Sequence, residues 1–171
     1  MLWFQKKTDE ANHASPEVDY PFAPKEPDTA AADEPPGRQA CLNHIQDTLR
    51  SNSRGVMLKL YLENFKQLNE IFGYDYCEAL LSKIIGYLKE TIQRPVYRYI
   101  GVEFIAVLDG YTQGQATALA ETILEQFDHV WKVEDTDCLC SAQIGLCCYP
   151  GYASSPQEIL KCLDAAIVKS S

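Results

Sequence analysis

A single carboxylate, Glu103, stands between apolar neighbours in the stretch RYIGVEFIAVLDG, residues 98–110. Two β-type runs, 96–99 and 104–108, flank the short connection Ile100-Gly101-Val102-Glu103. A short connection that contains Gly between such runs predicts a β-hairpin with Glu103 at its tip. A carboxylate there could hold a hydrated cation, but one carboxylate alone binds a cation only weakly. A solvated turn residue is therefore the simpler interpretation of Glu103.

Other residues that can do chemistry are scattered. His44 and His129 have no partners at metal-binding spacing, and we interpret both as surface or helix-packing residues. The seven cysteines contain no C-x-x-C pair, so a zinc site of the common spacing is not supported. We expect buried free thiols in a reducing cytoplasm.

Charge and composition exclude some classes of function. The formal net charge is -9 at pH 7, which disfavours nucleic acid as a partner because phosphate backbones are bound through Lys and Arg. The apolar start, Met1 to Phe4, is far too short to cross a bilayer, so we expect no transmembrane segment and a cytoplasmic location. Six of the nine prolines precede Gln39, among acidic residues, and we predict a disordered acidic Pro-rich tail over residues 1–38.

The remaining residues, 39–171, carry the apolar periodicity of one folded domain. Helical spacing predicts helices over 39–52, 64–72, 75–92 and 113–127, and a last helix from Pro156 through Ile167. Strands are predicted over 55–62, 96–99 and 104–108, with strand-like stretches between 138 and 149; the strand over 55–62 is apolar enough to be central. The order is a helix, then β-α-α-β-β-α-β, then a helix. It predicts an α+β, sandwich-like fold with a mostly antiparallel sheet, and helices on one face or wrapped around it.

Four segments in this order match the pattern of one known family. LYLENFKQLNEIFGY resembles D-x-D-x-F-K-x-x-N-D-x-x-G-H through Phe65, Lys66, Asn69 and Gly73. RYIGVEF stands where R-Y-G-G-D-E-F is expected and matches at Arg98, Tyr99, Gly101, Glu103 and Phe104. SAQIGLCCYP and LDAAI resemble the later S-I-G-x-x-x-Y-P and A-D-x-A-L segments. Over residues 39–171 the chain thus resembles a GGDEF domain, the nucleotide-cyclase-type fold of bacterial diguanylate cyclases.

This resemblance implies a reaction, and it also shows which of the family's functional residues are replaced in this chain. Active members join two GTP molecules into cyclic di-GMP, with one GTP held by each of two facing domains and Mg²⁺ held by carboxylates. The first expected Asp is Tyr61, the acid before Glu103 is Val102, and the first Gly of the signature is Ile100. If any metal ligand survives, the resemblance implies Glu103 and Glu63. We expect no cofactor, and Mg²⁺ only if a nucleotide is bound.

A vestigial nucleotide site would comprise the four positions Phe65, Lys66, Asn69 and Glu78, the last in place of an Asp. Arg98 and Lys66 could contact phosphate, although a single Arg in a strand is more often a snorkelling surface residue. Asn near a helix end more often satisfies local backbone groups. The family's inhibitory R-x-x-D product site falls on residues 91–94, TIQR, where neither charge is in place, so no product binding is expected there.

Three functions remain open. The leading interpretation is a non-catalytic domain in bacterial signalling that works by interaction and keeps at most a weak nucleotide pocket. Its partners would be GTP or a related guanine nucleotide, a second copy of the domain, or another signalling protein. The alternatives are an active diguanylate cyclase or nucleotide hydrolase with a rearranged metal site, and a purely structural domain without a nucleotide site.

Overall fold

The computed structural model describes residues 34–169, with side chains up to Ala166. Most of the predicted tail, residues 1–33, lies outside the described residues, so its predicted disorder stays a prediction. The first described helix, α2, spans Arg38–Arg50. Just before this helix, the carbonyl oxygen of Pro36 accepts a hydrogen bond of 2.9 Å from the backbone N–H of Arg98. The start of the domain is therefore tied to the hairpin that carries Glu103.

A five-stranded sheet with the order β2-β3-β1-β6-β7 runs through the domain. Its strands are β1 (Gly55–Leu62), β2 (Val96–Arg98), β3 (Glu103–Asp109), β6 (Ala142–Tyr149) and β7 (Ile167–Lys169). All four neighbouring pairs are antiparallel, which confirms the predicted sheet type. Every residue of β1 is buried, as expected of a central strand.

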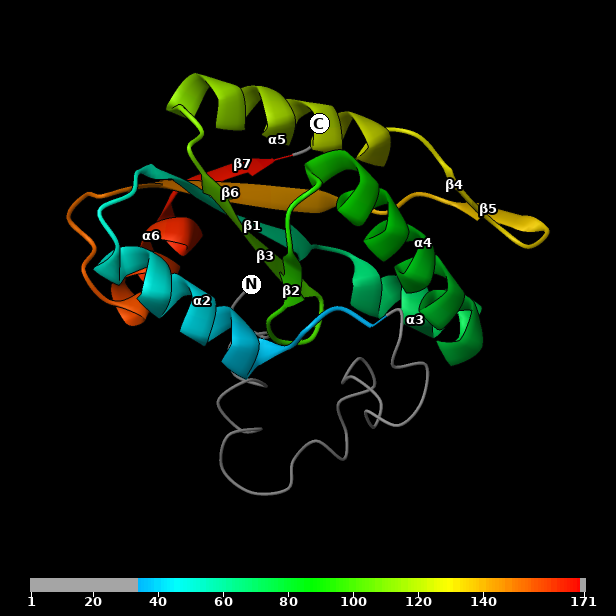
Figure 1. Ribbon diagram of the computed structural model, residues 1–171. Coiled ribbons are helices and arrows are strands. Elements are labelled where there is room, and N and C mark those ends of the chain that lie inside the picture. Colours follow the sequence, from blue (N-terminus) through cyan, green and yellow to red (C-terminus); the bar gives the residue numbers. More distant parts are fainter. Residues whose placement is uncertain (1–33, 170–171) are drawn as a thin grey trace.

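Helices cover both faces of this sheet (Figure 1). On one face α3 (Phe65–Phe72), α4 (Tyr74–Ile92) and α5 (Gln113–Phe127) enclose the larger core, to which β1 contributes Val56, Leu58 and Leu60. On the other face α2 and α6 (Pro156–Ala165) enclose a smaller core around Met57. The alternation along β1 follows from the period of two in a strand, and it places Lys59 on the face of α2 and α6.

The sequence predicted the last helix too long. The helix α6 ends at Ala165, and Ala166 leaves the helical conformation with φ -104° and ψ 65°. The carbonyl oxygen of Ala166 accepts a hydrogen bond of 3.2 Å from the N–H of Leu146, and β7 then pairs with β6. Edge pairing with β6 thus replaces the helical hydrogen bonds that the apolar periodicity had suggested.

A two-stranded ribbon was also missed. It consists of β4 (Trp131–Val133) and β5 (Thr136–Cys138), joined by a turn with Glu134 at φ 53°. Strands of three residues are too short to show a period in the sequence. The hydroxyl of Tyr76 on α4 donates to the carbonyl oxygen of Thr136 at 2.8 Å and attaches the ribbon to the domain.

Gly145 explains how closely α6 lies on β6. A Cβ at this position would lie 2.0 Å from the carbonyl oxygen of Leu163, far shorter than the non-bonded contacts that Cβ atoms make. The helix backbone therefore rests directly on the strand, and only Gly leaves it room. Within residues 34–169, no helix is both long and apolar enough to cross a membrane.

Candidate functional site at the signature hairpin

Glu103 is not at the tip of the hairpin. It is the first residue of β3, and the turn consists of Tyr99 to Val102. The N–H of Glu103 donates to the carbonyl oxygen of Ile100 at 2.9 Å, and its own carbonyl oxygen accepts from the N–H of Tyr99 at 2.8 Å. The left-handed conformation in this turn falls on Gly101, with φ 55°. Ile100 occupies a position where the family pattern has Gly, but its backbone does not adopt a conformation that only Gly tolerates.

Arg98 holds the turn from below. Its side chain is buried, its Nε donates to the carbonyl oxygen of Gly101 at 2.8 Å, and its Nη1 lies 4.0 Å from a carboxylate oxygen of Glu34. The expectation of a snorkelling surface arginine was wrong. The guanidinium is used inside the protein, where it fixes the hairpin that presents Glu103.

Glu103 forms a buried ion pair that sequence reasoning missed. The Nζ of Lys59 lies 2.9 Å from Oε1 of Glu103 and 2.6 Å from Oδ1 of Asp164 on α6. Glu103 is 6% exposed and Lys59 is 7% exposed, so the interpretation of Glu103 as a solvated turn residue was wrong. In the register of the sheet Tyr61 is opposite Glu103, and Lys59 is two residues earlier on the same face. A charged residue in the middle of an otherwise apolar central strand was the available signal.

The electrostatics of this pair follow from burial and charge. Burial lowers the pKa of Lys59, but the nearby carboxylates of Glu103 and Asp164 outweigh that effect, and the net direction is upward. Lys59 thus stays an ammonium ion at neutral pH. Burial raises the pKa of Glu103 above its ordinary value, although the Lys59 charge acts in the opposite direction. The carboxylate depends on Lys59 to remain charged in this position.

The two lost acids have become part of the packing. Val102 is 1% exposed, and its carbonyl oxygen accepts a hydrogen bond of 3.3 Å from the N–H of Leu62. Tyr61 is 3% exposed, and burial followed by the charges of Glu103 and Glu63 raises the pKa of its phenol to about 12. A phenol that keeps its proton at neutral pH is a poor ligand for Mg²⁺.

The residues present therefore do not fit a Mg²⁺ ion held by protein carboxylates. Such an ion requires several hard oxygen ligands. Here one expected position is a neutral phenol, one is an isopropyl group, and the third carries an ammonium ion 2.9 Å away. Across residues 34–169, no group of three or more His, Cys, Asp or Glu side chains is arranged to hold a metal ion.

The other predicted site residues lie around α3 and the start of α4. Glu63 follows β1; its N–H donates to the carbonyl oxygen of Ser141 at 2.8 Å, and its carboxylate accepts from Nε2 of Gln143. Phe65 and Phe104 are core residues, each 1% exposed. Lys66 is exposed and Glu78 is half-buried. The fold brings Glu63 and Glu103 to the same end of the sheet, with Tyr61 influenced by both, whereas Phe65 serves the core.

Asn69 differs from these positions. It lies on α3, where its carbonyl oxygen accepts the helix-ending hydrogen bond of 2.9 Å from the N–H of Gly73. The side-chain Oδ1 of Asn69 is buried and makes no hydrogen bond with any described residue. A buried acceptor without a partner is costly, so this amide is able to receive a donor from a ligand.

Arg94 is the only charged residue in the segment where the family has its product site. Its Nη1 donates to the carbonyl oxygen of Asp109 at 3.1 Å, and its guanidinium carbon lies 5.2 Å from the centre of the Tyr111 ring. The preceding Gln93 ends α4 in a left-handed conformation with φ 56°. These contacts show that Arg94 has partners within the fold. The prediction that no product binds at residues 91–94 stays a prediction.

The sheet order, the two helical layers and the β2–β3 hairpin define a nucleotide-cyclase-type domain. The model of the family described as "Diguanylate cyclase, GGDEF domain" matches residues 37–170, and the chain belongs to this family. Among curated proteins, the bifunctional diguanylate cyclase/cyclic di-GMP phosphodiesterase MucR of Pseudomonas aeruginosa is 26% identical over 125 residues, 72% of this chain and 18% of that protein. The signaling protein YkoW of Bacillus subtilis is 29% identical over 140 residues, 77% of this chain and 18% of that protein. The chain thus spans about a fifth of the length of these relatives.

Solved structures agree on the fold. The GGDEF domain of YfiN (TpbB) from Pseudomonas aeruginosa matches with a TM-score of 0.71 and 22% identity, over 77% of this chain and 81% of that chain. The coiled coil and GGDEF domain of DgcB from Caulobacter crescentus, solved in complex with c-di-GMP, matches with a TM-score of 0.71 and 13% identity, over 95% of this chain and 87% of that chain. The structural similarity establishes the architecture. At identities this low, the chemistry must be inferred from the residues of this chain.

Proposed function

We propose that this chain is a catalytically inactive GGDEF domain that acts in bacterial cyclic di-GMP signalling through interaction with a partner. The observation that supports it best is the ion pair between Glu103 and Lys59. The last carboxylate of the signature already has a cation 2.9 Å away, supplied by the chain itself. A divalent metal ion would have to displace an ammonium ion that is buried and held by a second carboxylate, Asp164.

Inactivity follows from what phosphoryl transfer requires. The reaction depends on positioning and on metal ions that neutralise phosphate charge. With Tyr61 and Val102 buried and Glu103 paired, the described residues form no cluster of free carboxylates at the hairpin. A partner protein suits the domain, because a structural neighbour of this fold, the diguanylate cyclase SiaD of Pseudomonas aeruginosa, was solved in complex with its activator SiaC.

A turnover assay tests the proposal. The purified chain, incubated with GTP and Mg²⁺ or Mn²⁺, should release no cyclic di-GMP and no pyrophosphate when the products are separated by chromatography and identified by mass. Glu103→Gln should give the same trace as wild type. Product formed by wild type and lost in Glu103→Gln would overturn the proposal and favour the active enzyme with a rearranged metal site.

Asn69 supports a second candidate function, the binding of a guanine nucleotide without turnover. Its buried, unpartnered Oδ1 is an acceptor, and the Watson–Crick edge of guanine presents N–H donors. Calorimetric titration with GTP, GDP and cyclic di-GMP should then give saturable binding that Asn69→Ala weakens. The matched control is Asn43→Ala on α2, on the opposite face of the sheet. Absence of any saturable heat would refute nucleotide binding and would leave a domain without a nucleotide site.

A further inference from the structure

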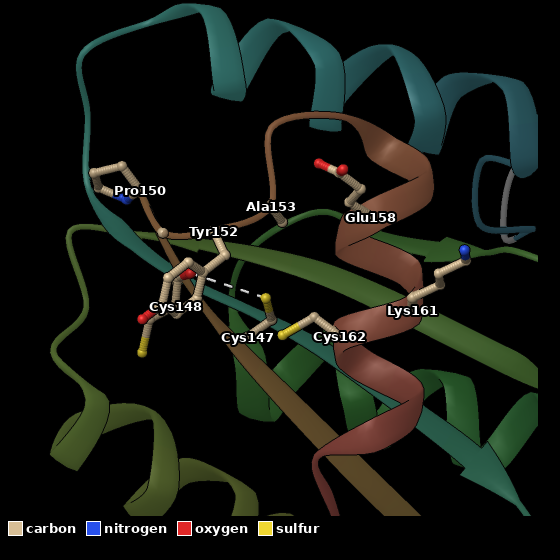
Figure 2. Close-up of a pocket in the computed structure, with 9 residues that line it drawn as sticks. Cys147, Cys148, Pro150, Tyr152, Ala153, Glu158, Lys161 and Cys162 are labelled. Atoms are coloured by element: carbon tan, nitrogen blue, oxygen red, sulfur yellow. Dashed lines mark hydrogen bonds between the residues drawn. The ribbon is translucent and has the colours of Figure 1, made fainter.

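A cavity of about 640 Å³ lies at the other end of β6, away from the signature hairpin. It is open to solvent on one side and is bordered by the end of β6, the loop that follows it and the helix α6 (Figure 2). Its volume lies within the range of small-molecule sites, roughly 300 to 1,000 Å³. Its lining is mostly apolar, with the Lys161 side chain at the α6 side and the fully exposed Tyr152 at the loop side.

Two thiols meet in the wall of this cavity. The sulfur of Cys147, from β6, and the sulfur of Cys162, from α6, point toward each other, whereas the sulfur of Cys148 points away (Figure 2). The Cys147 thiol also donates to the carbonyl oxygen of Cys148 at 3.8 Å. The close contact of α6 with β6 at Gly145 holds the strand and the helix that carry the two thiols together.

The two thiols differ in accessibility. Cys147 is 5% exposed, and burial followed by a hydrogen bond with the Cys162 thiol raises its pKa to about 12. Cys162 is half-buried and lies at the cavity. A reagent in the cavity therefore meets Cys162 first, and Cys147 is placed behind it as the second thiol.

We propose that Cys147 and Cys162 form a redox-active dithiol that the cavity exposes to a low-molecular-weight disulfide of the glutathione type. The Cys162 thiolate attacks one sulfur of the reagent, so that a Cys162–glutathione mixed disulfide forms and one glutathione thiolate leaves and takes up a proton. Cys147, after losing its proton to solvent, then attacks the Cys162 sulfur and expels the second glutathione. The protein gains one disulfide and loses two hydrogens, and the reagent is reduced to two thiols.

This bridge would act on the ion-paired network. It would link α6 covalently to β6 at Cys162, two residues before Asp164, which contacts Lys59 at 2.6 Å. Oxidation would thus fasten the helix that supplies one of the two carboxylates around Lys59. The proposal is independent of the catalytic state of the hairpin, because it rests on the two thiols and the cavity alone.

The other five cysteines serve as internal comparisons. Cys41, Cys77, Cys138 and Cys140 are buried, and Cys148 is exposed but has its sulfur directed away from the pair. The expectation that the cysteines are buried free thiols was therefore wrong for Cys148. A reaction that selects Cys147 and Cys162 over the exposed Cys148 would reflect their placement and not exposure alone.

The test uses the full chain treated with glutathione disulfide, then alkylated with iodoacetamide and analysed by intact mass and peptide mapping. We expect a chain lighter by two hydrogens, a peptide that links Cys147 to Cys162, and complete loss of alkylation at both, all reversed by dithiothreitol. Cys147→Ser should accumulate a stable glutathione adduct on Cys162. The control Cys148→Ser should form the bridge as wild type does.

Three results would overturn the proposal: no reaction at either thiol, a lasting glutathione adduct on wild-type Cys162, or a bridge that involves any other cysteine. Circular dichroism of each serine variant before treatment shows whether it is folded. If Cys147→Ser is unfolded, the intact-mass result for the wild-type chain decides the matter by itself.

Discussion

Lys59 and Glu103 form the ion pair on which the proposal of an inactive domain rests. A buried carboxylate requires a counter-charge, and the chain supplies it with an ammonium ion from the neighbouring strand. The Val102 side chain contributes roughly 1.5 to 3 kcal/mol by being buried, an energy that an aspartate in the same place would forgo. At the two positions, Val102 thus contributes to packing and Glu103 to one ion pair.

Removing Lys59 should expose the cost of the buried charge. Lys59→Met should lower the free energy of unfolding by about 3 to 5 kcal/mol, because Glu103 is left buried without a partner. Urea denaturation measures this, and the double variant Lys59→Met/Glu103→Leu should recover most of the loss. A loss under about 1 kcal/mol in the single variant would mean that the pair is not buried as described.

The same variant should respond to pH in a defined direction. Without Lys59 the pKa of Glu103 in the folded state rises further above its unfolded value, so the folded state binds a proton that the unfolded state has released. Stability of Lys59→Met should therefore fall as pH rises through the folded pKa of Glu103, and its deficit against wild type should be smaller at acid pH. A deficit that is constant from acid to neutral pH would contradict this.

Tyr61 gives a second pH dependence, at the alkaline side. Its pKa is raised from 10.0 to about 12 by burial, so the unfolded chain loses this proton first. Unfolding free energy should fall between these two pH values by up to about 1.4 kcal/mol per pH unit from this group. Tyr61→Phe should remove that part of the slope, whereas Phe at the exposed Tyr152 should not; equal slopes in all three proteins would refute it.

Residue roles were harder to predict from the sequence than residue positions. The segment RYIGVEF was correctly placed at a hairpin, but Glu103 was assigned to the tip although it begins β3. The partner Lys59 is 44 positions away in the chain. Only the register of β1 against β3 brings the two together, and a register cannot be derived from one strand alone.

At the scale of elements, the helix α6 lies so close to β6 that position 145 has no room for a side chain. Gly145→Ala places a methyl group against the carbonyl oxygen of Leu163 and should lower the free energy of unfolding by about 1 to 3 kcal/mol or more, measured by urea denaturation. Gly86→Ala is the matched control, since a Cβ there meets nothing within 4 Å inside α4. It should raise stability by about 0.5 to 1 kcal/mol. Equal effects of the two changes would disprove the close approach.

Long elements could be predicted and short ones could not. The helices α4 and α5 and the strand β1 carry apolar residues over enough positions for a period to be recognised. The strands β4, β5 and β7 have three residues each and depend on pairing partners supplied by the fold. For β7 the apolar residue Ile167 even matched the preceding helix, so tertiary pairing overrode a local pattern.

For the whole molecule, membership of the family does not by itself imply the family's chemistry. The chain has the GGDEF fold over residues 37–170, yet its hairpin carries an internal ion pair in place of free carboxylates. The matched segment makes up 18% of MucR and 18% of YkoW, so in both relatives the similar domain is one part of a longer protein. Under our proposal the domain acts through interaction, and the proposed dithiol at the opposite end of β6 would regulate it.

Mn²⁺ binding shows whether Glu103 is a metal ligand, because this ion takes the same oxygen ligands as Mg²⁺ and is detected by electron paramagnetic resonance. Mn²⁺ is titrated into the chain with GTP present, beside Glu103→Gln and a protein-free sample. We expect that the wild-type chain binds no Mn²⁺ through Glu103, so that wild type and Glu103→Gln give the same signal. A bound-metal signal in wild type that disappears in Glu103→Gln would show that the carboxylate is a metal ligand and that the domain keeps a metal site.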